Sequence, residues 1–288
     1  MPTSCFTSAQ RKISPLLLTI ALLFSATSQA QLLSAPQVLR ESRFEYKLLA
    51  PATSTPAFLT QANAEGSTRF SFVGDNAFGD PLNPAISAIY VRAAALPATY
   101  LYQTVPAASS VAAFISQLNT QGALGYRYFG DQIYAGTVAS VLVKESSSAT
   151  YQYRGLTLAS SASTFLALVN SEGAQGYQYQ GDIGVDSGGG NFVFASVFSR
   201  NSATPSTYSY ETATITASAA ALVVQANSQG ARNFLYRGGI AFGGSFSETL
   251  SLYEKDTTRG DTFRYEQLAR SATAPAFLSQ TKIGRAHV

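Results

Sequence analysis

A short pattern that recurs in one register constrains the fold of this chain more than any other feature. Each copy opens with two aromatic residues separated by one residue, and the second aromatic is always tyrosine: Tyr46, Tyr102, Tyr153, Tyr210 and Tyr265. A Ser or Thr follows at a fixed distance from each tyrosine: Ser54, Ser110, Ser161, Ser218 and Thr273. Such self-similarity is typical of small structural units that stack into an array.

Three further positions are invariant in the four complete copies. The first is an asparagine: Asn63, Asn119, Asn170 and Asn227. The second and third are glycines: Gly66, Gly122, Gly173 and Gly230, then Gly74, Gly130, Gly181 and Gly238. We expect the asparagines to satisfy backbone groups near a helix end, a structural role rather than a ligand-binding one. We expect the first glycine to end a helix in a left-handed conformation and the second to end a strand.

The order of signals within one copy predicts a βαββ unit. The aromatic pair indicates a strand, and the Ser or Thr is an N-cap candidate for a helix of about three turns. Two more strands follow, for example over residues 125–131 and 139–144. Asp75, Asp131 and Asp182 come after the second strand's glycine, where we expect them to favour a turn.

The fold class is therefore α+β, with each helix packed on a three-stranded, mainly antiparallel sheet. We place the complete units at residues 36–98, 99–149, 150–206 and 207–261, with a truncated fifth at 262–281. Alternation along the strands predicts that most tyrosines face the helix and form the core. Tyr90, Tyr134 and Tyr253 are less constrained by this alternation, so the sequence leaves open whether these side chains are buried or exposed.

The unit resembles a small bacterial βαββ family, domain of unknown function 4177. The likeness rests on the segment LNTQGALGY at residues 118–126 and on the apolar strand that ends at Lys144. Arg69 and Asn233 replace the family's second glycine in copies one and four, and Tyr or Phe stands in place of its Trp. The resemblance implies a fold and carries over no catalytic residues.

The two ends of the chain are predicted to lie outside the repeats. Residues 1–30 have the basic start, apolar run and small-residue ending of a signal peptide. Cleavage after Ala30 predicts a secreted or periplasmic protein with no transmembrane segment in the mature chain. Residues 282–288 resemble a translated sequencing adapter, because Lys282 and Arg285 stand where the other copies have Asn and Gly.

These ends hold the residues that most chemistry would require. The only cysteine, Cys5, lies in the signal peptide, and the only histidine, His287, lies in the adapter-like segment. A Ser-His-Asp triad and a histidine metal site are therefore not expected. The tract Gly188–Gly190 lacks the ending of a phosphate loop, and the aspartates lack calcium-loop spacing.

We therefore expect no metal, no cofactor and no catalysis. The excess of basic residues also belongs largely to the two ends, so nucleic acid is not an expected partner. The function that these features favour is a non-catalytic scaffold or binding module of the bacterial envelope or exterior. Its partner would be a protein or a surface polymer. Two alternatives stay open: an accessory region of an exported enzyme or anchored protein, and a plain spacer. The sequence does not choose an oligomeric state.

Overall fold

The structure is a computed structural model that describes residues 44–80, 82–93, 97–134, 136–147, 149–242, 248–269 and 271–283. The predicted signal peptide at 1–30 lies outside these residues, and so does most of the adapter-like segment, at 284–288.

Four successive units have the same order of strand, helix, strand and strand, which confirms the α+β prediction. Unit 1 contains β1 (Phe44–Leu49), α2 (Thr55–Ser67), β2 (Ser71–Phe78) and β3 (Ala85–Ala93). Unit 2 contains β4 (Tyr100–Pro106), α3 (Val111–Ala123), β5 (Arg127–Tyr134) and β6 (Thr137–Glu145). Unit 3 contains β7 (Tyr151–Thr157), α4 (Ala162–Ala174), β8 (Gln178–Asp186) and β9 (Phe192–Asn201). Unit 4 contains β10 (Tyr208–Thr214), α5 (Ala219–Gly230), β11 (Leu235–Phe242) and β12 (Glu248–Asp256).

Each unit forms its own sheet, and the last strand of the unit is the central one. The orders are β1-β3-β2, β4-β6-β5, β7-β9-β8 and β10-β12-β11. Both neighbours run antiparallel to the central strand, with Tyr102 opposite Val143 and Arg127 opposite the same valine. The first and second strands, which the helix connects, are therefore not neighbours, and the third strand lies between them.

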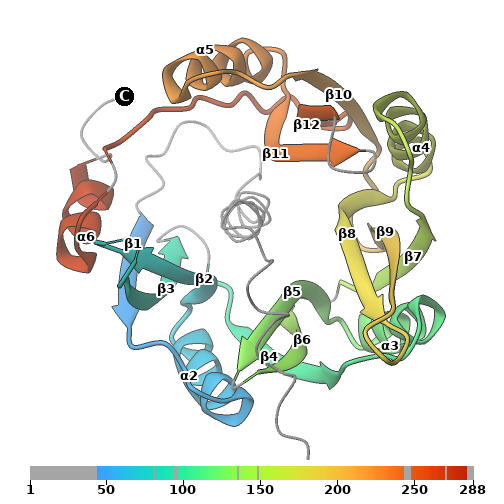
Figure 1. The fold of residues 1–288 in the computed structure, drawn as a ribbon. Helices are drawn as coiled ribbons and strands as arrows, with labels where there is room; N and C mark the ends of the chain where they lie inside the picture. The colour runs from blue at the N-terminus through green and yellow to red at the C-terminus, as the bar shows by residue number, and fades with distance from the viewer. Residues whose placement is uncertain are drawn as a thin grey trace, which may run out of the picture.

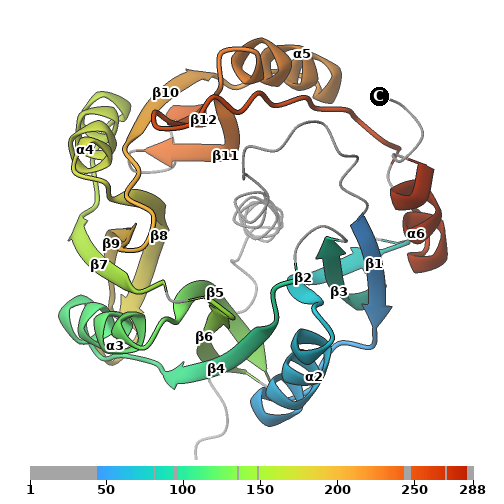
Figure 2. The same ribbon diagram turned by 180° about the vertical axis from the view of Figure 1, so that it is seen from behind.

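The units are arranged in a ring with the helices on its outer side and the sheets on its inner side (Figures 1 and 2). Unit 5 contributes an extended segment at residues 261–269 and α6 (Ala274–Ile283). α6 lies beside β1 of unit 1, where Phe277 contacts Tyr46 and Phe78 at ring-centroid distances of 5.9 and 5.7 Å. The fifth helix thus brings the end of the array back to its start.

The serine column begins the helices, as predicted. Each serine has extended backbone, and its hydroxyl accepts a hydrogen bond from the backbone N–H three residues later. Thr273 makes the same contact with the amide of Ala276, at 3.3 Å. One free amide at the start of each helix is thereby satisfied.

The first glycine column does not end the helices, so that prediction was wrong. Gly66, Gly122 and Gly173 lie within their helices, and Gly230 is the last residue of its helix. The left-handed residue comes three positions later, and it is not always a glycine: Arg69, Gly125, Gly176 and Asn233, with φ of 73°, 90°, 85° and 74°. The first column therefore has another purpose.

The second glycine column does not end the strands either. The pairing register shifts between Phe72 and Gly74, and at the equivalent place in every unit, so one extra residue forms a β-bulge. The strand continues beyond it to Phe78 in unit 1. Asp75, Asp131 and Asp182 consequently lie within strands and not in turns: Ser140 and Ser196 donate hydrogen bonds of 2.7 Å to the latter two.

The core lies between successive sheets. Phe58 on α2 packs with Tyr90 of its own unit and with Tyr102 and Val141 of unit 2 in one cluster. A second cluster joins α3 to unit 3, and a third joins α4 to unit 4. The sheets of units 2 and 3 are therefore covered on both faces. Tyr134 of unit 2 is buried against α2, whereas Tyr90 and Tyr253 are buried in clusters that include residues of their own units. The sequence left the exposure of these three tyrosines open, and the structure buries all of them.

Candidate functional site

The asparagine column joins each unit to the next. Asn119 on α3 accepts a hydrogen bond from the backbone N–H of Tyr153 at 2.7 Å and donates one to the carbonyl of the same residue at 3.1 Å. The pairs that repeat this contact are Asn63 with Tyr102, Asn170 with Tyr210, and Asn227 with Tyr265. The asparagines do satisfy backbone groups, as predicted, but those groups belong to the following unit.

The tyrosine in each pair makes a second contact, back to the preceding unit. The hydroxyl of Tyr153 accepts a hydrogen bond of 2.7 Å from the backbone N–H of Tyr128, and Tyr102, Tyr210 and Tyr265 do the same. Burial is the main cause that raises the pKa of Tyr102 to about 12. It also raises the pKa of Tyr153 and Tyr210. These phenols are structural groups that stay protonated at neutral pH.

The first glycine column allows the helix to approach the next strand closely. A Cβ on Gly122 would lie 2.3 Å from the carbonyl oxygen of Tyr151, a distance that real Cβ atoms do not adopt. Gly66, Gly173 and Gly230 meet Tyr100, Tyr208 and Phe263 in the same way, at 2.1, 2.4 and 2.1 Å. The invariant Asn and first Gly of the repeat therefore serve one surface, the joint between units.

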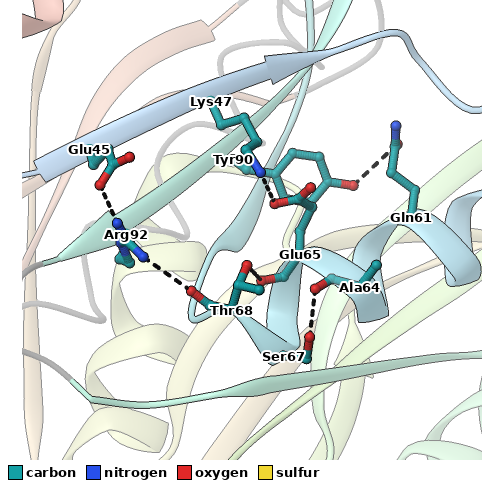
Figure 3. Close-up of polar contacts among 9 residues, drawn as sticks. All are labelled: Glu45, Lys47, Gln61, Ala64, Glu65, Ser67, Thr68, Tyr90 and Arg92. Carbon is teal, nitrogen blue, oxygen red and sulfur yellow. Dashed lines mark hydrogen bonds and ion pairs between the residues drawn. The ribbon is translucent and has the colours of Figure 1, made fainter.

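A polar cluster ties the helix to the sheet within a unit (Figure 3). In unit 1, Lys47 on β1 contacts Glu65 on α2 at 2.7 Å, and Arg92 on β3 contacts Glu45. Both cations also lie over the ring of Phe70, at 5.0 and 4.6 Å from its centroid. Such contacts are worth roughly 0.5–1 kcal/mol each at exposed sites.

The same cluster recurs with different residues. Arg154 and Arg200 flank Tyr177 in unit 3, and Arg154 pairs with Glu172 at 2.8 Å. Unit 2 replaces the ion pair with a hydrogen bond from Gln103 to Gln121. Because each cation already has partners within its own unit, we assign these clusters to the fold.

One buried ion pair has no counterpart among the described residues of units 1 to 3. Arg237 on β11 and Glu254 on β12 lie 3.6 Å apart, and both side chains are almost completely buried. Gln178 of unit 3 donates a hydrogen bond of 2.6 Å to Glu254, and Arg237 donates one of 3.0 Å to the carbonyl of Tyr179. The pair thus belongs to the joint between units 3 and 4.

The hairpins formed by the second and third strands of units 1 to 3 carry exposed apolar side chains at equivalent positions. In units 1 to 3, the residue three positions after the bulge glycine lies on the second strand. It is the antiparallel partner of a residue near the start of the third strand. These pairs are Ala77 with Ile86, Ile133 with Val138, and Gly184 with Phe194. Ile133 is 71% exposed, and Ile86, Val138 and Phe194 are also exposed.

Unit 3 adds a second aromatic to this surface. Phe192 is 57% exposed and lies on the same side of β9 as Phe194, with ring centroids 6.4 Å apart. Gly184 leaves room for Phe194, because a Cβ there would lie 2.9 Å from its ring. We call Ile86, Ile133, Val138, Phe192 and Phe194 the apolar hairpin face. Adjacent exposed apolar groups, such as Phe192 and Phe194, are typical of interaction sites.

The sequence analysis did not single out this face. A signal for it is present in the third strands, where Ile86, Val138 and Phe194 each stand six residues before a basic residue: Arg92, Lys144 and Arg200. To predict that they are exposed, one must know which alternate residues of each strand face outward. The β-bulge inserts one residue and so reverses this alternation. The asparagine column and the first glycine column, which the sequence did single out, are instead covered by the next unit.

No group of three or more His, Cys, Asp or Glu side chains in the described part of the chain is placed to hold a metal ion. None of the helices in the described ranges has the length and apolar character needed to cross a membrane.

Comparison with known proteins identifies no relative. No family model matches the chain, and neither a curated protein nor a solved structure matches it.

Proposed function

We propose that this chain is an exported, non-catalytic binding module in which the ring of units presents the apolar hairpin face to a protein partner. The observation that carries the proposal is the recurrence of exposed apolar side chains at one position in three successive units. Repeat proteins commonly bind through surfaces formed by equivalent positions of neighbouring units.

The chemistry of the face favours a protein segment as the ligand. Ile86, Ile133 and Val138 are aliphatic, and Phe192 and Phe194 provide two adjacent rings. Aliphatic and aromatic side chains gain most from burial against other apolar side chains, about 25 cal/mol per Å² removed from water. A surface polymer rich in sugars would use the two phenylalanines and leave the aliphatic positions without a partner.

Export rests on the signal-peptide pattern of residues 1–30. The absence of catalysis rests on the sequence: the mature chain has no cysteine, and its only histidine lies in the adapter-like segment.

A peptide array tests the binding role. The full chain is applied to immobilised peptides of known, varied sequence, and its variant F192S/F194S is applied to a duplicate array. L124S/V224S is the matched control, because Leu124 and Val224 are also exposed but lie at the helix side of their units. We expect apolar peptides to bind the wild type and the control, with binding at least about tenfold weaker for F192S/F194S.

Two results would contradict the proposal. Equal binding by the wild type and F192S/F194S would show that the peptides do not bind at the apolar hairpin face. Binding to soluble glycan fragments, with no peptide bound, would make the ligand a polymer.

A further inference from the structure

Beyond its β-bulge, β8 of unit 3 has an outer edge that no described strand covers. β8 is an edge strand, because the order in its sheet is β7-β9-β8. Before the bulge, the next unit occupies the outer edge: the hydroxyl of Tyr210 accepts a hydrogen bond of 2.8 Å from the backbone N–H of Tyr179. After the bulge, no strand among the described residues pairs with it. We call this stretch the open edge of β8; it contains Asp182, Gly184 and Asp186, which are all exposed.

The pairing within unit 3 shows which backbone groups face the open edge. The N–H of Tyr179 points away from β9, so the backbone of its partner Phe198 points away from β8. Because backbone groups alternate in direction along a strand, those of Ala195 point towards β8, where Ile183 is the partner. Gly184 comes next, so its N–H and C=O face the open edge, as do those of the residues two positions on either side.

Gly184 makes the middle of this edge accessible to a second backbone. The equivalent positions of units 1, 2 and 4 carry alanine or isoleucine. The rings of Phe192 and Phe194 lie over Gly184, since a Cβ there would be 3.5 and 2.9 Å from them. Glycine within a strand often marks a place where another backbone approaches closely. A strand placed beside Gly184 would therefore meet the two rings of the apolar hairpin face.

Negative charge flanks the two rings. Asp182 and Asp186 lie two residues on either side of Gly184, so their side chains are on the same face of the sheet as these rings. Ser196 and the backbone N–H of Gly188 donate hydrogen bonds of 2.7 and 2.8 Å to the two carboxylates and hold them in place. Residues 178–199, which span the whole hairpin, contain these two acidic residues and no Lys, Arg or Glu. The hairpin therefore favours a positively charged ligand.

We propose that the protein segment that binds the apolar hairpin face does so as an antiparallel β-strand added to the open edge of β8, with an apolar residue opposite Gly184 and a basic residue two positions on either side of it. This inference rests on the proposed function and names the conformation and the sequence pattern of the ligand. Backbone hydrogen bonds to the edge supply affinity in such complexes, and alternate side chains supply specificity.

A second copy of the chain fits this edge less well than a basic segment. If two β8 strands paired antiparallel about Gly184, Asp182 of each copy would lie opposite Asp186 of the other. Like charges directly opposite one another destabilise a strand pair, whereas opposite charges stabilise it. The charge of the edge therefore selects a basic partner over a second β8.

Two synthetic peptides of the same composition test the sequence pattern. In an added strand, TKTVTKT places both lysines on the face of the valine, whereas TTKVKTT places them on the opposite face. Each is titrated into the full chain, and nuclear magnetic resonance follows the Gly184 amide. We expect TKTVTKT to bind at least about threefold more tightly than TTKVKTT. We also expect it to slow the exchange of the Gly184 amide with solvent.

Two further peptides test whether the ligand binds through its backbone. One is TKTVTKT with a methyl group on the valine nitrogen, whose N–H would face Gly184. The other carries the methyl group on the next nitrogen, whose N–H would point away from β8. We expect the first to bind about tenfold more weakly than the second, because it lacks a hydrogen bond to the edge.

A charge variant of the chain locates the lysines. Asp186→Asn removes the charge but keeps an oxygen that can accept from the Gly188 amide. It should bind TKTVTKT at least about threefold more weakly than the wild type. The control is Asp80→Asn in unit 1, which likewise keeps an acceptor for the backbone N–H of Leu82 and should bind as the wild type does.

Four outcomes would overturn the proposal: no binding of TKTVTKT, equal affinity for the two peptides of the same composition, equal affinity for the two methylated peptides, or a dimer of the chain alone in which the Gly184 amide is protected. The last would give the edge to a second copy. The array with F192S/F194S decides the proposed function separately. If that variant lost binding while the two methylated peptides bound equally, the apolar hairpin face would remain the site and strand addition would be rejected.

Discussion

At the joint between units 2 and 3, three residues of α3 contact unit 3. At the joint between units 5 and 1, the described side-chain contacts are between aromatic rings. Phe114, Asn119 and Gly122 of α3 respectively fill the core, bond the backbone of Tyr153 and approach Tyr151. Phe277 of α6 contacts Tyr46 and Phe78 of unit 1. Position 282, where the asparagine would stand, is a lysine, which donates hydrogen bonds but cannot accept them.

This difference separates two contributions to the ring. Apolar packing is sufficient to bring α6 against unit 1, while the asparagine and glycine fix how closely a helix meets the next strand. We expect the inner joints to be stable and the closing joint to open more readily.

The largest expected effect comes from removing the helix phenylalanine at each joint. Phe114→Ala should lower the free energy of unfolding by about 3–5 kcal/mol, because its ring is buried in the joint. Phe277→Ala should cost about 1–2 kcal/mol, because its ring is only half-buried. Urea unfolding followed by circular dichroism measures both. An equal loss of stability in the two variants would show that the two joints do not differ in the way described. No loss of stability for Phe277→Ala would show that α6 does not hold the circle of units closed.

The next effect tests the close approach at the inner joint. Gly122→Ala should destabilise the chain by about 3 kcal/mol, since its methyl group would overlap the carbonyl of Tyr151 and force the two units apart. Gly239→Ala is the control, because a Cβ there would meet its nearest atom, the carbonyl oxygen of Leu250, at an ordinary 3.9 Å. Thermal and urea unfolding of the two variants should differ clearly. If Gly122→Ala were as stable as Gly239→Ala, the glycine column would not be explained by the joint.

A smaller effect should appear at alkaline pH. The unfolded Tyr102 loses its proton near pH 10, whereas burial in the joint raises its pKa in the fold to about 12. Above about pH 10 the folded state therefore holds more protons than the unfolded state, so stability falls as pH rises towards about 12, by about 2–3 kcal/mol for this one group. Urea midpoints across this range measure the slope, with Tyr102→Phe as the control that should reduce it. A midpoint that does not change with pH would contradict the burial of this phenol.

The sequence predicts much of the unit and little of the ring. The serine N-caps and the βαββ order follow from local spacing, since capping and strand alternation are properties of short segments. The rotation that relates one unit to the next depends on contacts between distant residues, so no short segment of the sequence predicts it. Gly122 illustrates the limit: a glycine near a helix end is equally compatible with a left-handed turn and with a close approach, and only the position of Tyr151 decides between them.

The exposed surface was harder to predict than the core for a related reason. Tyr128 and Phe129 are consecutive, yet both pack in the interior, because the sheet of unit 2 is covered on its two faces. The bulge before Gly130 then changes which side chains face out, so that Ile133 is exposed beside the buried Tyr134. Simple alternation cannot separate these two neighbours.

The most direct test of the account is amide hydrogen exchange in Asn119→Ala, because the central claim is that the invariant asparagine holds the next unit. The Tyr153 amide, which donates to Asn119 from 34 residues away in the sequence, should exchange faster in this variant. The Tyr102 and Tyr210 amides, which bond to Asn63 and Asn170, should keep their wild-type rates. Faster exchange confined to unit 2, with Tyr153 unchanged, would contradict the claim that this asparagine joins one unit to the next.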